Sequence, residues 1–235
     1  MGKKKVNTSF MNLNRDAKYI SSHVTFQSFL VKKKHWENKY TYHNWHLVFA
    51  NKDSIYLSRH DVSKTFLSDT SLGLVKSLVW GFPTGNKPGG ANFEQFFSKL
   101  NFFIQQIEQI KTTSLSNQAF KSLNSIPGIK TSVTTKLLYF SGCKANNARC
   151  LIFDRRVLDT LQLFKFTEFN SLEEELGKLR ASPQKISFEV YSAYCKICSQ
   201  IAAKLGVKAE IIEYLLFNKS IQIALAKAAE TEPRK

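Results

Sequence analysis

Apolar positions recur at helical spacing along most of the chain from about residue 59 onward. The clearest run is NFEQFFSKLNFFIQQIEQI, where Asn92 can cap the start of a helix. Its apolar residues recur at Phe93, Phe96, Phe97, Leu100, Ile104 and Ile107. This spacing gathers them on one side of a helix, so the pattern predicts one amphipathic helix here.

Cap residues, glycines and prolines bound the other predicted helices. The segment SDTSLGLVKSLVWGFP predicts a helix that stops at Gly81 and Pro83. Further helices are predicted in SNQAFKSLNSI, in TSVTTKLLYFSG closed by Gly142, in FDRRVLDTLQLF capped by Asp154, from Ser182-Pro183 through Ala203 with an end at Gly206, and in KAEIIEYLLF. Strand signals are few, and residues 21–57 leave a short hairpin and a helix both open. We therefore expect a mostly α fold.

The length of the chain limits the number of domains that it can form. Its 235 residues suit one large domain or two tightly joined lobes, with enough material for a core. Residues 1–57 form a basic, aromatic segment that we expect to pack on the core. Residues 58–235 are expected to form that helical core, and the two parts are expected to make one structural unit.

The charge balance narrows the range of partners. Thirty-four Lys and Arg against eighteen Asp and Glu give a net charge of +16. Such a field favours polyanions, nucleic acid first and an anionic membrane surface second, although a basic protein without an anionic partner remains an alternative. No apolar run reaches the roughly 18 residues of a membrane span, and MGKKKVNTSF lacks the apolar stretch of a secretory signal. A cytoplasmic location is therefore expected.

The cysteines suggest core packing rather than a metal centre. They are Cys143, Cys150, Cys195 and Cys198. Without an export signal, disulfides are not expected. The last two lie three apart in a predicted helix, where thiols usually pack in the core. A four-thiolate metal site is the alternative, but no histidine has zinc-ligand spacing with these cysteines. We expect no metal and no cofactor.

The stretch SIPGIKTSVTTKLLYF joins two predicted helices through a tight turn. Gly128 lets the backbone turn sharply, and the first amides of the following helix then point toward any approaching anion. A DNA phosphate fits this position, and Lys130 adds positive charge. The pattern is that of a helix-hairpin-helix motif, although Pro-Gly before a helix can also be an ordinary turn.

A second motif, an aspartate behind an apolar run, follows the hairpin in the sequence. Asp154 lies eighteen residues after Lys136, behind an apolar run in CLIFDRRVL. The hairpin, the lysine on its second helix and the later aspartate resemble the helix-hairpin-helix (HhH-GPD) DNA glycosylase superfamily, in particular its 8-oxoguanine DNA glycosylase branch. The resemblance covers about residues 59–217. Two positions depart from the family pattern: Lys130 replaces the second hairpin glycine, and Ser132 stands where the branch usually carries its lysine.

The resemblance implies a two-lobed helical fold with a cleft between the lobes. Double-stranded DNA would lie across the mouth of the cleft, with one nucleotide flipped inside. The implied activity is excision of a damaged or modified base, 8-oxoguanine-like, with AP lyase activity through a lysine Schiff base. The chain is too short for the extra β domain of the eukaryotic enzymes, so it is similar to the compact prokaryotic members. A monomer that does not bind membranes is expected.

Lys136 and Asp154 are the candidate catalytic residues. Breaking an N-glycosidic bond builds positive charge on the sugar, which the carboxylate of Asp154 would stabilise. Helix capping alone is the structural alternative for Asp154. A neutral lysine amine can attack the sugar carbon. Ser132 and Lys136 lie on one helical face, and helical side chains lean toward the N-terminus, so the Lys136 amine can reach the usual position. Lys130 is the competing nucleophile, and Lys136 has a plain alternative as a solvated helix residue.

The remaining candidates would bind DNA or the extracted base. The DNA-binding set is Pro127, Gly128, Ile129, Lys130, Ser132, Arg155 and Arg156. Base extraction also needs side chains that stack on a base or wedge into the duplex. VWGFP offers Trp80 and Phe82, which are predicted on a loop, and Tyr214 and Phe217 are further pocket candidates. A place in the core is the structural alternative for Trp80.

Several functions remain open at this point. Base excision by a DNA glycosylase is the first hypothesis. A non-catalytic helix-hairpin-helix module that binds DNA or RNA is the second, because the lysine is displaced and a hairpin glycine is missing. A peripheral membrane protein rests on charge alone. Relatives that resemble this chain also occur among bacterial anti-phage genes, so a modified phage base is an alternative target.

Overall fold

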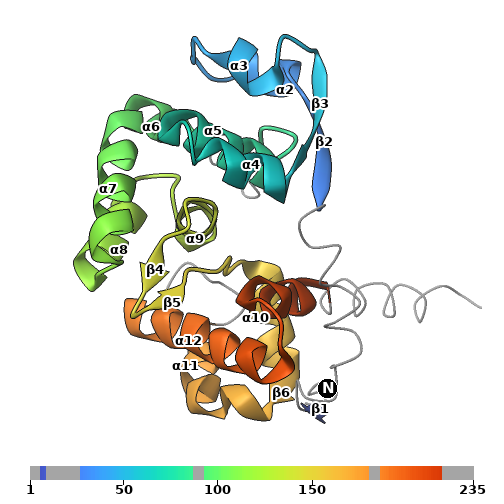
Figure 1. Ribbon diagram of the computed structural model, residues 1–235, viewed down its shortest axis with the longest axis vertical. Helices are drawn as coiled ribbons and strands as arrows, with labels where there is room; N and C mark the ends of the chain where they lie inside the picture. Colours follow the sequence, from blue (N-terminus) through green and yellow to red (C-terminus); the bar gives the residue numbers. More distant parts are fainter. Residues whose placement is uncertain (1–5, 9–26, 87–92, 180–185, 219–235) are drawn as a thin grey trace, which may run out of the picture.

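The structure is a computed structural model that describes residues 6–8, 27–86, 93–179 and 186–218. It is mostly helical, as the sequence predicts (Figure 1). The helices are α2 (Lys34–Glu37), α3 (Trp45–Phe49), α4 (Arg59–Thr65), α5 (Thr70–Gly81), α6 (Glu94–Ser98), α7 (Leu100–Thr113), α8 (Asn117–Ser125), α9 (Thr131–Phe140), α10 (Arg155–Leu163), η3 (Thr167–Leu172, 3₁₀), α11 (Glu173–Lys178) and α12 (Phe188–Leu205). A further helix covers residues 209–218. The two lobes and the boundary at residue 57 stay predictions.

The strands are short and pair in twos. Strand β2 (Ser28–Lys32) runs antiparallel to β3 (Ser54–Ser58), and α2 and α3 lie between them in the chain. The early segment thus contains both the hairpin-type pairing and the helices that the sequence left open. Strand β1 (Val6–Thr8) pairs in parallel with β6 (Phe164–Phe166), and β4 (Lys144–Ala145) pairs with β5 (Ala148–Arg149).

Side-chain caps define the starts of several helices, as the sequence predicts for α10. The capping residues are Ser58 of α4, Asp69 of α5, Ser116 of α8, Asp154 of α10 and Ser187 of α12. Each accepts a hydrogen bond from a backbone amide of the first turn, which satisfies a donor that has no partner within the helix. Gly142 and Gly206, the predicted helix ends, have φ values of +73° and +67°.

The run predicted as a single helix from Asn92 divides into α6 and α7. The break lies at Lys99, with φ of −111° and ψ of 21°. Asn92 itself lies outside the described residues. Phe97 before the break stacks on Tyr40, with ring centroids 5.3 Å apart, while Phe103 after the break is fully buried. Aromatic packing on the two sides of the break therefore overrides the helical periodicity.

The long helix near the C-terminus starts later than predicted. Helix α12 begins at Phe188, because the hydroxyl of Ser187 caps it by accepting from the amide of Val190. Ser182 and Pro183, the predicted start, lie outside the described residues. The predicted end at Gly206 is confirmed. A serine that can accept from a backbone amide of the following turn thus marked the start of the helix better than the Ser-Pro pair did.

An extended segment, residues 150–153, runs through the centre of the core. Leu151 and Phe153 are fully buried. The backbone amide of Phe153 donates to the hydroxyl of Thr135 on α9 (3.1 Å). From the other side, the hydroxyl groups of Tyr191 and Tyr194 on α12 donate to the carbonyls of Leu151 (2.9 Å) and Ile152 (3.2 Å). These bonds satisfy backbone groups that lie outside any sheet, and they fix where the next residue, Asp154, stands.

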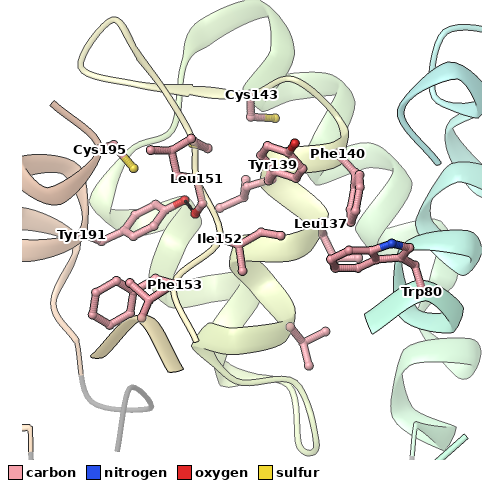
Figure 2. Close-up of a cluster of buried hydrophobic side chains, with 14 of the residues drawn as sticks. Trp80, Leu137, Tyr139, Phe140, Cys143, Leu151, Ile152, Phe153, Tyr191 and Cys195 are labelled. Carbon is pink, nitrogen blue, oxygen red and sulfur yellow. Dashed lines mark hydrogen bonds between the residues drawn. The ribbon is translucent and has the colours of Figure 1, made fainter. Parts of the chain in front are cut away.

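Helix α9 occupies the middle of the molecule (Figure 1). Figure 2 shows the segment of Leu151, Ile152 and Phe153 between α9 and the tyrosine-bearing α12. Trp80 of α5 packs on Phe140 of α9, with ring centroids 5.0 Å apart. Helix α9 is therefore held by α5 on one side and by residues 150–153 on the other, which gives the side chains of its first turns a rigid base.

A buried ion pair links α4 to the helix of residues 209–218. The guanidinium of Arg59 donates to both carboxylate oxygens of Glu213, at 2.6 Å and 3.1 Å. The side chains are 2% and 0% exposed. Burial opposes the charge of Arg59, but the nearby Glu213 and Tyr139 raise the pKa of Arg59 above its ordinary value. Burial also raises the pKa of Glu213, against the opposing effect of Arg59.

Within the described ranges, no helix has both the length and the apolar character needed to cross a membrane.

Replacing Arg59 with methionine should destabilise the fold by about 3–5 kcal/mol, because Glu213 would remain as an unpaired buried charge. The loss should be larger at pH 8 than at pH 5. An unpaired, buried carboxyl has a folded-state pKa above its unfolded value, so its stability contribution is lost as pH rises. Urea denaturation at both pH values measures this. The double variant Arg59→Met/Glu213→Met is the control and should recover most of the stability. A loss below about 1 kcal/mol in the single variant would contradict the structural importance of the pair.

Candidate active site

A cavity of about 370 Å³ opens where the central helix meets its neighbours. Its walls come from the end of α5 and the turn after it, from the first turns of α9, from residues 152–156, and from β2, α4 and the helix of residues 209–218. The wall includes Ser132, Lys136, Asp154, Arg155, Arg156 and Phe217, which the sequence singled out from separate segments. The fold thus brings most of the candidate residues into one pocket.

The Lys136 side chain folds back by one helical turn along α9. Its Nζ donates to the hydroxyl of Ser132 at 3.0 Å and to the carbonyl of Ser132 at 3.1 Å. The same nitrogen lies 3.7 Å from Oδ2 of Asp154, and 5.6 Å from the centre of the Phe82 ring. The side chain is only 8% exposed. The amine therefore lies at the Ser132 position, as the helical geometry predicts, and not in bulk solvent.

The surroundings of this amine favour its neutral form. Burial lowers the pKa of Lys136 below its ordinary value of 10.5. The negative charges of Asp154 and Glu213 act in the opposite direction, and the positive charge of Arg59 acts with burial. The net direction is downward, which increases the share of unprotonated amine at neutral pH. An unprotonated amine is the form that can act as a nucleophile.

Asp154 uses its two carboxylate oxygens in different ways. Oδ1 accepts from the amides of Arg156 (3.0 Å) and Val157 (3.2 Å), so the residue is the N-cap of α10 as predicted. Oδ2 faces the amine of Lys136. The cap locks the carboxylate in place, and the side chain is still 16% exposed at the pocket wall. Capping and a role in the pocket are therefore compatible in this fold.

The two arginines after Asp154 lie at the outer part of the pocket. Arg155 is 62% exposed and pairs with Asp159 on the same helix, Nε to Oδ1 at 2.8 Å. The guanidinium of Arg156 lies over the ring of Phe217, 4.7 Å from its centre. Both line the cavity from its exposed side, where positive charge can meet an anionic ligand.

The aromatic candidates divide between the core and the pocket wall. Trp80 was predicted on a loop, but it lies within α5 and is 3% exposed, because α5 extends through Gly81. It packs against Phe29 and Phe140, and it still contributes to the pocket wall. Phe82 directly after the helix is half-buried and lines the pocket.

The last two aromatic candidates lie on one helix. Phe217 lines the pocket, whereas Tyr214 does not. Tyr214 stacks beside Phe217, with ring centroids 6.4 Å apart, and its ring lies 5.8 Å from the guanidinium carbon of Arg59. Tyr214 therefore supports the wall from behind.

The hairpin turn lies beside the cavity rather than in its wall. Helix α8 ends at Ser125, and Gly128 makes the turn with φ of +79°, a value that favours glycine. Pro127 is exposed, whereas the side chain of Ile129 is fully buried, so Ile129 can offer only its backbone to a ligand. Lys130 is the N-cap of α9 and makes no side-chain cap hydrogen bond. The turn thus presents the start of α9 together with a lysine.

Sequence reasoning missed several residues of the pocket wall, and Arg59, Gly81 and Glu213 are the ones with a part in its chemistry or shape. Glu213 stands inside the apolar run IIEYLLF, and a carboxylate among apolar residues of a helix is a usable sign of a buried pair. Arg59 carries no comparable sign in SRHDV. Its partner is 154 positions away, so only the folded chain identifies it.

The described part of the chain offers no metal centre: no group of three or more His, Cys, Asp or Glu could hold an ion there. The four cysteines are free and buried. Burial raises the pKa of Cys143 to about 11 and that of Cys195 to about 12. Burial therefore favours the protonated form of these thiols, and none of the four lines the pocket.

Comparison with known proteins gives one result. No curated protein and no solved structure matches the chain. The model of one protein family, described as "Putative 8-oxoguanine DNA glycosylase OGG-like protein", matches residues 22–217. This range includes the hairpin, the pocket and every candidate residue. The chain belongs to the 8-oxoguanine DNA glycosylase OGG-like family.

Proposed function

We propose that this protein is a DNA glycosylase that removes a damaged or modified base, 8-oxoguanine-like, from double-stranded DNA. We further propose that it cleaves the strand through a Schiff base on Lys136. One observation carries the proposal: the amine of Lys136 is buried in a pocket, held by Ser132 and placed 3.7 Å from the carboxylate of Asp154. Membership of the OGG-like family supports the glycosylase class.

The chemical step follows from the neutral amine. Its lone pair forms a bond to C1′ of the flipped nucleotide as the bond between C1′ and the base breaks. The base leaves with the bonding electrons and takes up a proton, and the amine loses one. The nitrogen lone pair then forms a C1′=N double bond as the C1′–O4′ bond breaks. O4′ keeps the electron pair of that bond and takes up the proton that the nitrogen gives up, which leaves an imine and an open sugar ring. Borohydride reduces this imine by hydride transfer, which fixes the DNA to the protein and makes the intermediate measurable.

Asp154 would stabilise positive charge on the sugar as the base departs. Its cap hydrogen bonds hold the carboxylate in place before the substrate arrives. A fixed charge of this kind needs no reorganisation during the reaction, which is where electrostatic stabilisation is most effective. The same carboxylate is the nearest group to the amine that could accept its proton.

DNA binding would use the hairpin and the rim of the pocket. The start of α9 offers amides without helical partners, and Lys130 stands beside them. Arg155 and Arg156 lie at the exposed edge of the cavity. These groups suit phosphates on either side of a flipped nucleotide, and the net charge of +16 favours approach to DNA. Phe82 and Phe217 would then stack on the extracted base.

A binding module without catalytic activity is the second candidate. The observation in its favour is that Ser132 stands where the family resemblance places a lysine. What supports the glycosylase against this candidate is that Lys136 Nζ bonds to Ser132 itself, so an amine could act from that position. The two candidates differ in one measurable property, which is covalent trapping on a lesion.

Lys136→Gln should abolish borohydride trapping on lesion-containing duplexes while leaving DNA affinity nearly unchanged, because one of 34 Lys and Arg is neutralised. Wild type is assayed on duplexes with 8-oxoguanine, other damaged bases and modified bases. Its trapping rate should rise with pH and level off below the ordinary lysine pKa of 10.5. Lys130→Gln is the control and should still trap.

Trapping that survives in Lys136→Gln but vanishes in Lys130→Gln would assign the nucleophile to Lys130. No base release or trapping by wild type on any duplex would favour the binding module.

Asp154→Asn should slow base release by about 10² or more, because a fixed charge is lost. Asparagine caps a helix as well as aspartate, so unfolding free energy should hold, whereas Asp154→Ala should lose about 1 kcal/mol. The pH dependence of trapping by Asp154→Asn should shift to lower pH, since the charge of Asp154 raises the pKa of Lys136. Single-turnover base release and urea denaturation measure the two effects. Equal base release in wild type and Asp154→Asn would remove Asp154 from the mechanism.

Lys130→Ala should weaken binding to all duplexes about equally, with or without a lesion, because phosphate contacts carry no sequence information. The slope of log affinity against log salt should become smaller by about 1 for the lost contact. Fluorescence anisotropy across a salt series measures this. Lys178→Ala, on α11 away from the hairpin, is the matched control and should leave the slope unchanged. A slope that is unchanged in Lys130→Ala would place the hairpin lysine outside the DNA interface.

A further inference from the structure

Gly81, the last residue of α5, lies directly against the side chain of Lys136. A Cβ atom placed on Gly81 would stand 2.8 Å from Cδ and 3.2 Å from Cε of Lys136. The first distance is shorter than real Cβ contacts, so a side chain at position 81 would have to displace the lysine stem. Gly81 and Lys136 also line the same cavity.

The backbone does not require glycine at position 81. The described glycines with positive φ are Gly85, Gly128, Gly142 and Gly206, and Gly81 is not among them. Its conformation is therefore open to any L-residue. A glycine inside a helix costs about 0.5–1 kcal/mol relative to alanine. What glycine supplies here is space, and the atoms that occupy this space belong to Lys136.

The occupied space is the path by which the amine reaches its position. The stem of Lys136 runs back along α9 to place Nζ on Ser132, 3.0 Å from the hydroxyl. The groups that hold the amine are fixed: Ser132 is in the first turn of a helix, and Asp154 is locked as a cap. They cannot follow a displaced stem. A methyl group at position 81 would therefore push the stem off the path that brings the amine to both of them.

We propose that Gly81 is a positioning residue, whose missing side chain leaves the channel through which Lys136 reaches the reaction position one turn back along α9. The inference rests on the proposed function, in which the Lys136 amine is the nucleophile. A nucleophile supplied from position 136 needs this channel. Gly81 on α5 and Lys136 on α9 thus act together: the glycine leaves the space, and the lysine stem fills it.

The test compares Gly81→Ala with Gly177→Ala. Gly177 is also in a helix, is distant in sequence from the pocket, and would meet no heavy atom within 4 Å if it gained a Cβ. The substrate is a duplex with one abasic site, which reacts with the amine without any base in the pocket. Borohydride trapping rates are measured over a pH series and divided by the fraction of protein that binds the duplex. A loss of folded protein then does not count as a loss of rate.

Gly81→Ala should trap about 10–100-fold more slowly at saturating DNA, because small misplacements of a reacting group have effects of this size. DNA affinity should stay within about twofold, since no group that meets phosphate is changed. The pH dependence of trapping should shift to higher pH, because an amine displaced toward the open pocket regains water. Gly177→Ala should match wild type in all three measurements. A purely structural role of Gly81 would change the melting temperature and not the pH dependence.

Two outcomes overturn the inference. Equal trapping by Gly81→Ala and wild type would show that the channel is not needed. Normal trapping on abasic DNA with lost base release on a lesion would show that the added methyl group blocks the base instead of the lysine. Failure of the proposed function looks different, because wild type would then not trap, or Lys136→Gln would trap as well as wild type.

Discussion

The hydrogen bonds between the Thr135 hydroxyl and the backbone of Phe153 are the constraint on which the site depends. Thr135 precedes Lys136 on α9 and accepts from the amide of Phe153, the residue before Asp154. One contact thus sets the distance between two helices at the point where each contributes a candidate catalytic side chain to the pocket. Tyr191 and Tyr194 hold the same segment from α12. Lys136 and Asp154 are therefore held by the core and not by a surface loop, which limits the movement of both side chains.

The charges of the pocket come in a balanced set. Leaving aside the exposed Arg155 and Arg156 at the outer edge, two cationic side chains, Lys136 and Arg59, face two carboxylates, Asp154 and Glu213. Burying such groups is costly unless each has a partner, and the pair of Arg59 and Glu213 is fully closed on itself. Lys136 and Asp154 are held less tightly, at 3.7 Å and in partial contact with solvent. In the proposed function, the looser pair is the one that exchanges its partner for the substrate, while the tighter pair keeps the wall in place.

The sequence predicted the local elements of the site better than their environment. The hairpin, the cap at Asp154 and the reach of Lys136 all follow from turn chemistry and helix geometry, which act over a few residues. The break at Lys99 and the place of Trp80 inside α5 did not follow, because aromatic packing from distant segments decides them. The pairing of Arg59 with Glu213 and the contact of Gly81 with Lys136 join separate helices, and no local pattern encodes such contacts.

The burial of the cysteines has a consequence for the setting in which this family acts. Oxidised bases arise where oxidants are present, and oxidants attack exposed thiolates first. Here Cys143, Cys150, Cys195 and Cys198 are all buried, with pKa values raised by burial. A chain with this arrangement keeps its four cysteines as poorly reactive thiols under the conditions that would create the oxidised base of the proposed function. The resistance of these cysteines to oxidation is then a property of the packed core. Lys136 and Asp154 of the pocket contain no sulfur, so oxidation of thiols does not affect them directly.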